Sequence, residues 1–319
     1  AMLVFIAMIF FFAGLISQGT KWNFYTYITN RFGYSEFADF RYGFLRVSAT
    51  VNTVLAGYIM ILGLLAVEYF RGVRALGFVQ GWMLRGMCVT TAFFTFSRGA
   101  WLGMIAAYAT FLLFARMPRS SRPALIALGL IVGAPIAVIA SSSGDFDSFD
   151  DFGTFGYRQE LLRTSIAYIA MHPLFSDPLF RESGFFDHLY QGQGIIDVVN
   201  TYVNIALRYG LTGLTLFVGA FAAAVMGLLK LGEIVRRTND RALELQRAVM
   251  LAAIAGYMTT IFTTSSTNVF VQIFTLVLAL SVALTAAARA EATSSPDDGE
   301  SPHAAPERDA VDTQGDLNG

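Results

Sequence analysis

Long apolar runs separated by short polar breaks make up most of the chain. The runs fall near residues 2–17, 48–70, 75–96, 100–115, 124–140, 203–229, 248–264 and 268–287. A hydrocarbon core about 30 Å thick is crossed by roughly 20 helical residues, so each run approaches the length of a membrane-spanning helix, and the shorter ones must tilt little. The pattern predicts an all-α, polytopic transmembrane helix bundle of about eight spans.

The composition agrees with a membrane protein. Of the 319 residues, 55% are hydrophobic and only 14% are charged, which is more apolar than a soluble domain of this size requires. The first run lacks the basic leader and the small-residue cleavage pattern of a secretory signal, so we expect a helix there. Because the chain begins inside this run, one interpretation is that earlier helices precede it in a longer protein.

Lysine and arginine in short loops predict which side of the bundle faces the cytoplasm, because basic loops resist translocation. Basic breaks occur at 71–74, 116–123 and 230–247. They alternate with the spans in such a way that all three share one side, which we expect to be cytoplasmic. The aspartate-rich segment at 141–202 and the break at Ser97 would then face outward.

The chain divides into a membrane domain at 1–287, which includes the large external loop at 141–202, and a tail at 288–319. The tail is rich in Ala, Ser, Pro, Asp and Glu and has almost no large apolar residue, so we expect it to be disordered and cytoplasmic. Within the external loop, residues 156–175 carry apolar side chains at helical spacing and then meet Pro173. This pattern predicts an amphipathic surface helix.

Several arginines fall on the predicted outer side, against the positive-inside tendency. They are Arg98, in "TFSRGAWLG", together with Arg41, Arg46, Arg158, Arg163 and Arg208. A guanidinium presents a fixed fork of donors that suits phosphate, and it stays charged at any working pH. The pattern therefore indicates a lipid diphosphate as substrate. The alternatives are that Arg98 extends to the phosphates of membrane lipids and that some of the others form ordinary surface ion pairs.

One further arginine, Arg85, falls near the middle of an apolar run. Charge inside a membrane is costly and usually faces the interior of the bundle or a wet cavity. We expect Arg85 to pair with Glu68, at the inner end of the neighbouring span. The alternative is that it supports a functional site.

The sequence gives no sign of a metal or nucleotide cofactor. The single Cys88 lies in an apolar run, so a disulfide framework is excluded. The histidines, His172, His188 and His303, lack metal-ligand spacing, and neither a Walker loop nor a dinucleotide fingerprint occurs. The acidic stretch at 143–153 does not place its aspartates at EF-hand positions. We therefore expect no cofactor, no metal and no nucleic-acid partner.

Four stretches carry further information through their order along the chain. They are "FRYGFLRVSATVNTVLAGYI", "TFSRGAWLG", "YRQELLRTSIAYIAMHPLF" and "VVNTYVNIALRYGLTGLTLF", and together they span roughly residues 40–230. In order, spacing and topology this set resembles the O-antigen ligase and O-antigen polymerase superfamily of bacterial surface-polysaccharide enzymes.

The resemblance implies a transfer reaction at the outer face of the bacterial inner membrane. A glycan carried on undecaprenyl diphosphate moves to an acceptor hydroxyl, either on lipid A-core, as in a ligase, or on a growing surface polysaccharide, as in a polymerase. The resemblance also implies independence from metals and nucleotides. The external arginines, with Arg98 first, would neutralise the departing diphosphate.

Such a transfer needs a base that deprotonates the acceptor hydroxyl. In much of the superfamily a histidine precedes the asparagine of the last motif, whereas this chain has Val199 before Asn200. Asp197 and His188 are the candidate bases, and Asp197 is preferred because it lies close to Asn200 and Tyr202 in the sequence. The alternatives are a helix N-cap for Asp197 and an interfacial loop residue for His188. Asn200 and Tyr202 either contact sugar hydroxyls or pack at headgroup level.

Two other classes of function compete with an enzyme. A transporter or flippase of lipid-linked glycans would use the same arginines, but it must expose its site to both sides and usually has paired broken helices. Here the unusual charges are concentrated on one side. A noncatalytic scaffold for envelope assembly would leave the arginines without a chemical role.

Overall fold

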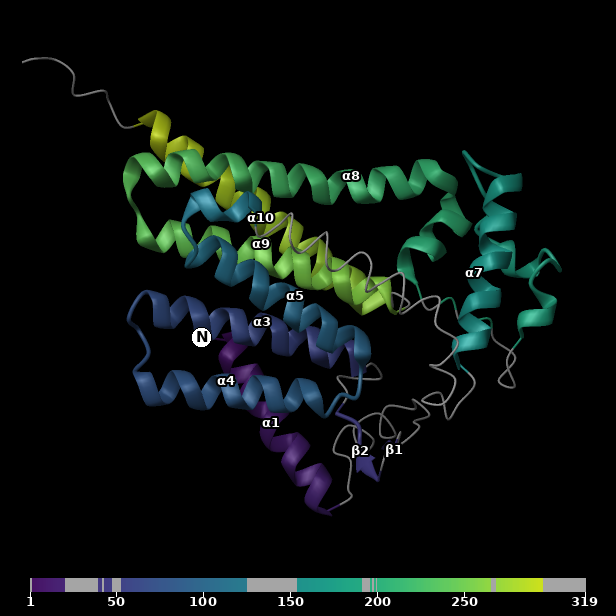
Figure 1. Ribbon diagram of the computed structural model, residues 1–319, viewed down its shortest axis with the longest axis horizontal. Coiled ribbons are helices and arrows are strands. Elements are labelled where there is room, and N and C mark those ends of the chain that lie inside the picture. The colour runs from purple at the N-terminus through teal and green to yellow at the C-terminus, as the bar shows by residue number, and fades with distance from the viewer. Residues whose placement is uncertain are drawn as a thin grey trace, which may run out of the picture.

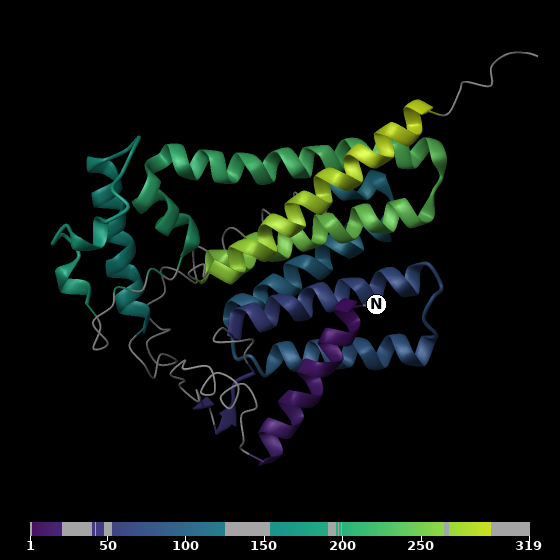
Figure 2. The same cartoon turned by 180° about the vertical axis from the view of Figure 1, so that it is seen from behind.

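The computed structural model describes residues 2–20, 40–41, 43–47, 53–124, 154–190, 196, 198, 200–264 and 268–294. Within these residues the fold is a bundle of long helices with one short hairpin (Figures 1 and 2). The bundle helices are α1 (Met2–Thr20), α3 (Thr53–Gly72), α4 (Phe78–Phe93), α5 (Arg98–Ala115), α8 (Thr201–Thr238), α9 (Arg241–Phe262) and α10 (Asn268–Ser294). The hairpin pairs β1 (Phe40–Arg41) with β2 (Phe44–Leu45) in antiparallel fashion. The prediction of an all-α bundle is confirmed.

The apolar runs correspond to helices wherever the structure describes them. Among the described helices, five are long and apolar enough to cross a membrane, namely α1, α3, α5, α8 and α9. Helix α4 has 16 residues, and α10 crosses α8 and α9 obliquely (Figure 2). The predicted span at 124–140 lies outside the described residues except for its first position. The total of eight spans therefore stays a prediction.

Helix α10 continues past residue 287, where the sequence analysis places the start of a disordered tail. It ends at Ser294, so residues 288–294 are helical. Small residues and arginine in "TAAARAEATS" are adequate helix formers, which explains why the loss of large apolar side chains does not end the helix. Residues 295–319 lie outside the described part of the chain.

The three basic breaks lie at one end of the bundle, as their spacing predicts. Arg119 Nη2 donates to the carbonyl of Gly232 at 3.1 Å, and Arg241 Nη1 donates to the carbonyl of Ala115 at 3.3 Å. Figure 1 shows the connection between α3 and α4 at the same end. We call it the basic end. The opposite end carries helix α7 (Thr154–Met171) and is called the α7 end (Figure 1).

A buried ion pair joins α3 to α4 inside the bundle. Arg85 Nε donates to Glu68 Oε1, and only 8% of Arg85 and 2% of Glu68 is exposed. Helix α5 shares the same carboxylate, because the Tyr108 hydroxyl donates to Glu68 Oε1 and Arg116 Nη2 lies against Oε2, each at 3.4 Å. The predicted pairing of Arg85 with Glu68 is confirmed. Each charge thereby compensates the other within the apolar bundle.

Removal of one partner should cost much more than removal of both. In Glu68→Ala the Arg85 charge is left buried without its carboxylate, so we expect the free energy of unfolding to fall by roughly 3–5 kcal/mol. The double variant Glu68→Ala/Arg85→Met removes both charges, and its cost should be smaller than the sum of the costs of Glu68→Ala and Arg85→Met alone. Thermal unfolding in detergent measures these differences, with the exposed Glu233→Gln as control. Strict additivity would contradict a coupled pair.

Candidate functional site

The turn between α4 and α5 places Arg98 at the first residue of α5. The Thr95 hydroxyl donates to the carbonyl of Ala92 at 2.7 Å and so satisfies the end of α4. Phe96, with φ of 47°, reverses the chain, and Ser97 takes the N-cap position of α5. The side chain of Arg98 is exposed at the positive end of the helix dipole. Among the described residues its guanidinium has no hydrogen-bond or ion-pair partner.

Arg46 supports this turn from the preceding segment. Its Nε donates to the carbonyl of Thr95 at 2.9 Å, and its Nη2 donates to the Thr53 hydroxyl at 2.8 Å and to the carbonyl of Phe96 at 3.5 Å. The fork of donors that the sequence analysis assigns to diphosphate is thus used by the protein itself. The structure nevertheless brings the charge of Arg46 to the turn from which Arg98 starts α5.

Close packing holds the start of α5 against the last turn of α9. A Cβ atom on Gly99 would clash with the Thr263 hydroxyl and would lie 3.2 Å from the carbonyl oxygen of Thr260. Only a residue without a side chain lets the two backbones approach this closely. Arg98 is therefore fixed beside the end of α9.

Helix α8 begins beside the same end of α9. The Thr201 hydroxyl donates to the carbonyl of Thr264 at 2.7 Å. Asn200 is the N-cap of α8, and its Oδ1 accepts from two backbone N–H groups of the first turn at 2.9 and 3.3 Å. The Tyr202 hydroxyl donates to the carbonyl of Met258 at 3.0 Å. The oxygen of Asn200 and the hydroxyl of Tyr202 therefore have partners within the protein, and the N-termini of α5 and α8 both adjoin the last residues of α9.

The external helix predicted at 156–175 is α7, which ends at Met171, before Pro173. Its apolar face packs on the first segment of α8 and on two short turns, η3 (Phe180–Glu182) and η4 (Asp187–Leu189). The buried side chains of this cluster include Leu161, Tyr168, Phe180, Phe186, Leu189 and Leu207. Leu161 and Tyr168 are thus covered by protein, whereas Leu162 and Ile166 of the same helix are 47% and 60% exposed. Helix α7 forms a layer over the start of α8.

Helix α8 breaks at Gly210, and the turn that follows α7 fills the break. Gly210 has φ of 69° and ψ of −172°. Leu211 N donates to the carbonyl of Pro173 at 2.8 Å, and Thr212 N donates to the carbonyl of Leu174 at 3.3 Å. Two backbone groups freed by the break are satisfied in this way. Figure 1 shows the short first segment of α8 between α7 and the bundle.

Polar side chains at every fourth position mark one face of this first segment of α8. They are Asn200, Asn204 and Arg208. Asn204 Oδ1 and Arg208 Nε are buried and have no hydrogen-bond partner among the described residues. Groups of this kind usually bind water or a ligand. Asn204 is absent from the set that the sequence analysis selects, although its spacing from Asn200 and Arg208 was visible there.

His188 lies away from this face, on η4 against α7. Its Nε2 atom is 3.4 Å from the Thr164 hydroxyl and 3.9 Å from Glu160 Oε1. About half of the His188 side chain is exposed, at 52%. Arg158, on the same side of the bundle, is exposed on α7. In the part of the chain that the structure describes, no contact joins His188 to Arg98.

Two predicted site residues cannot be placed with their side chains. Asp197 lies outside the described residues, as does Val199. Arg41 is described through its backbone, which pairs with Phe44 in the hairpin. The described residues contain no group of three His, Cys, Asp or Glu side chains that could hold a metal ion.

Residues 86–218 match the family model described as O-antigen ligase. The match contains Arg98, α7 and the first segment of α8, whereas Arg46 precedes it. Over this stretch the chain is similar to the O-antigen ligase family, which confirms the resemblance seen in its motifs. The protein is an integral membrane protein of a class that transfers glycans in the assembly of envelope polysaccharides. The comparison with curated proteins gives no match.

Substitution of Gly210 should loosen the attachment of α7 to α8. A Cβ atom there would clash with the carbonyl of Leu174. The backbone conformation itself, with positive φ and ψ near 180°, costs about 1–3 kcal/mol for a residue with a side chain. We expect Gly210→Ala to lower the melting temperature and to speed proteolysis after α7. The control is Gly219→Ala in the same helix, where a Cβ meets no atom within 4 Å. Equal behaviour of the two variants would contradict this account of the break.

Proposed function

We propose that the protein transfers a glycan from undecaprenyl diphosphate to an acceptor hydroxyl, on lipid A-core or on a growing surface polysaccharide, at the periplasmic face of the bacterial inner membrane. The observation that carries the proposal is the position of Arg98. It is an exposed arginine at the N-terminus of α5, beside the N-terminus of α8, inside a stretch of the O-antigen ligase family.

The electrostatics of the α7 end support a diphosphate at this position. Each helix N-terminus carries about half a positive charge, and it favours anions whose oxygens accept from its free N–H groups. The start of α5, which has no side-chain cap, acts together with the full charges of Arg98 and Arg46. The dipole of α8 adds to this field, although two N–H groups of its first turn already donate to Asn200. Positive charge held in place before the reaction stabilises a leaving group whose negative charge grows in the transition state.

The face of α8 that carries Asn204 and Arg208 is the proposed contact for the glycan or for the outer phosphate. Their unpaired buried atoms, an amide oxygen and a guanidinium nitrogen, supply one acceptor and one donor. A bound sugar hydroxyl would satisfy both, because it can donate to the amide oxygen and accept from the guanidinium, whereas a phosphate oxygen would accept from Arg208 alone. The layer formed by α7 closes over this face through the apolar cluster around Tyr168 and Leu207.

In the proposed reaction the acceptor hydroxyl attacks the anomeric carbon of the glycan. The new glycosidic bond forms as the bond to the diphosphate oxygen breaks, and the diphosphate leaves with the electron pair. A base takes the proton of the hydroxyl. Asp197 stays the preferred base because it lies three residues before Asn200 in the sequence. Asn200 is the N-cap of α8, whose start lies near Arg98. His188 is the alternative, and its Nε2 atom lies 3.9 Å from Glu160 Oε1.

The break at Gly210 favours a second candidate, a transporter of lipid-linked glycans, because transporters often bind their cargo at interrupted helices. In this chain, however, two of the N–H groups at the break are bonded to the turn after α7. They are thus not free to bind a substrate. Glycan transfer is the function that the site supports better.

The direct test compares Arg98→Ala and Arg98→Lys with the unaltered protein. Purified protein is incubated with an undecaprenyl-diphosphate-linked glycan and candidate acceptors, with EDTA and without nucleotide. We expect the alanine variant to lose transfer by about 100-fold or more, as loss of one donor to a developing anion usually does. The lysine variant should keep part of the activity, since it retains the charge but not the fork.

Two further variants separate chemistry from folding. Arg237→Ala removes an exposed arginine at the basic end and should leave transfer unchanged. Arg46→Ala leaves the carbonyls of Thr95 and Phe96 without their donor, so it should lower thermal stability, by about 1–3 kcal/mol, together with activity. Full activity of Arg98→Ala would refute the role of Arg98. Movement of the lipid in vesicles without any transfer would favour the transporter.

A further inference from the structure

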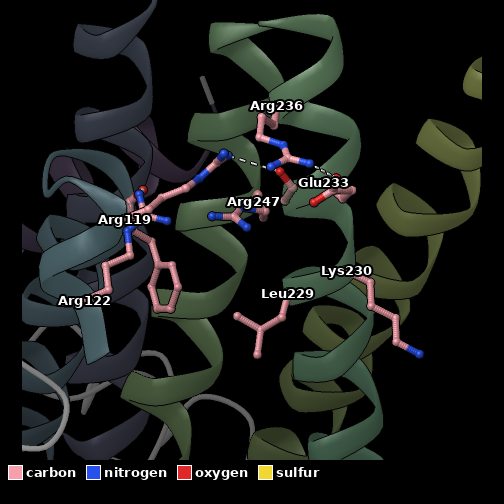
Figure 3. Close-up of a pocket in the computed structure, with 9 residues that line it drawn as sticks. Arg119, Arg122, Leu229, Lys230, Glu233, Arg236 and Arg247 are labelled. Atoms are coloured by element: carbon pink, nitrogen blue, oxygen red, sulfur yellow. Dashed lines mark hydrogen bonds and ion pairs between the residues drawn. The ribbon is translucent and has the colours of Figure 1, made fainter. Parts of the chain in front are cut away.

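A cavity of about 540 Å³ lies at the basic end (Figure 3). Arg98, by contrast, begins α5 at the α7 end. It opens between the C-terminal end of α5, the short turn η1 (Arg119–Ser121), α8 and α9. Five cationic side chains and one carboxylate line it, namely Arg119, Arg122, Lys230, Arg236, Arg247 and Glu233. The proposed transfer reaction uses none of these residues.

Arg247 is the central residue of this cavity. Figure 3 shows its guanidinium between Arg119 and Arg122 on one side and Glu233 on the other. Only 3% of Arg247 is exposed, and its Nε and Nη2 have no hydrogen-bond partner among the described residues. A buried charge without a counter-charge is costly, so a site built around Arg247 lacks an anion.

The surrounding side chains hold Arg247 in this position. Its Cζ lies 5.6 Å from the centre of the Phe114 ring. Gly232 faces it on α8, and a Cβ atom there would clash with Nη1 of Arg247. The absence of a side chain at Gly232 therefore gives the guanidinium its room.

The carboxylates nearest Arg247 are each paired with another arginine. Glu244, which lies near Arg247, forms an ion pair with Arg241. Glu233 is paired with Arg236 one turn further along α8. Arg122 donates to the carbonyls of Phe114 and Met117 at 2.9 and 3.1 Å, which fixes its own guanidinium. Burial and the nearby charge of Arg119 lower the pKa of Arg122, and Glu244 offsets part of this effect. Several cations thus crowd around one space.

We propose that this cavity binds a phosphate group, supplied either by the headgroup of an anionic membrane phospholipid or by a free phosphate compound. Arginine forks match phosphate oxygens two at a time, and several of them meet here. Phe114 and Leu229 add an apolar wall to the same cavity, and 45% of Leu229 is exposed. Basic pockets between membrane helices commonly hold lipid headgroups, and an acyl chain would lie along that wall.

The test uses the purified full chain and two probes. Phosphatidylglycerol, compared with phosphatidylcholine in nanodiscs and followed by native mass spectrometry, tests the lipid source. Inorganic diphosphate, titrated by calorimetry, tests the free source. We expect Arg247→Met, which keeps the apolar stem but not the charge, to weaken binding at least tenfold.

Arg119→Gln changes an exposed side chain of the same cavity and should weaken binding several-fold. This variant tests the phosphate site even if Arg247→Met fails to fold. The matched control is Arg237→Gln, which neighbours Arg236 outside the lining and should bind as the unaltered protein does. If the unaltered protein binds phosphatidylglycerol but not diphosphate, the source of the phosphate is a lipid headgroup. If it binds diphosphate but not the lipid, the source is a free phosphate compound. The proposal is overturned if neither probe binds or if Arg119→Gln and Arg237→Gln behave alike.

Discussion

The close approach of α5 to α9 determines where the arginines at both ends of the bundle lie. Small residues recur at every fourth position of α5, as Gly99, Gly103 and Ala107, and so form a stripe along one face. A Cβ atom on Gly103 would lie 2.8 Å from the carbonyl oxygen of Gly256, and one on Gly256 would lie 2.9 Å from Ala107. Lipid provides no hydrophobic force between helices, so tight packing of small residues replaces it.

This packing links two ends with different chemistry. At the α7 end it fixes Arg98 beside the start of α8, whose broken first segment is held by the turn after α7. At the basic end it brings the turn after α5, with Arg119, toward Arg247 of α9. If both proposals hold, the exposed arginine at one end and the cationic cavity at the other bind phosphate groups on opposite sides of the membrane.

The sequence predicted those features that depend on local patterns. Apolar runs located the helices, and the two isolated charges in neighbouring spans located the pairing of Arg85 with Glu68. Features that depend on backbone conformation or on distant partners were not predictable. Nothing in the local pattern shows that Arg46 binds the carbonyl of Thr95, or that Gly210 rather than another glycine interrupts α8. The basic cavity was missed because its cations come from separate segments, which the sequence analysis used only for orientation.

Glycan transfer at the α7 end requires that this end face the periplasm. The orientation can be measured by introducing a cysteine at one exposed position of each end, as Gln159→Cys on α7 and Thr238→Cys at the end of α8. Each cysteine is then treated in cells with a maleimide that does not cross the inner membrane. The natural Cys88 is only 1% exposed and should react little. We expect Gln159→Cys to be labelled in intact cells and Thr238→Cys only after permeabilisation. Labelling in the reverse order, or of both positions from outside, would contradict the proposed orientation.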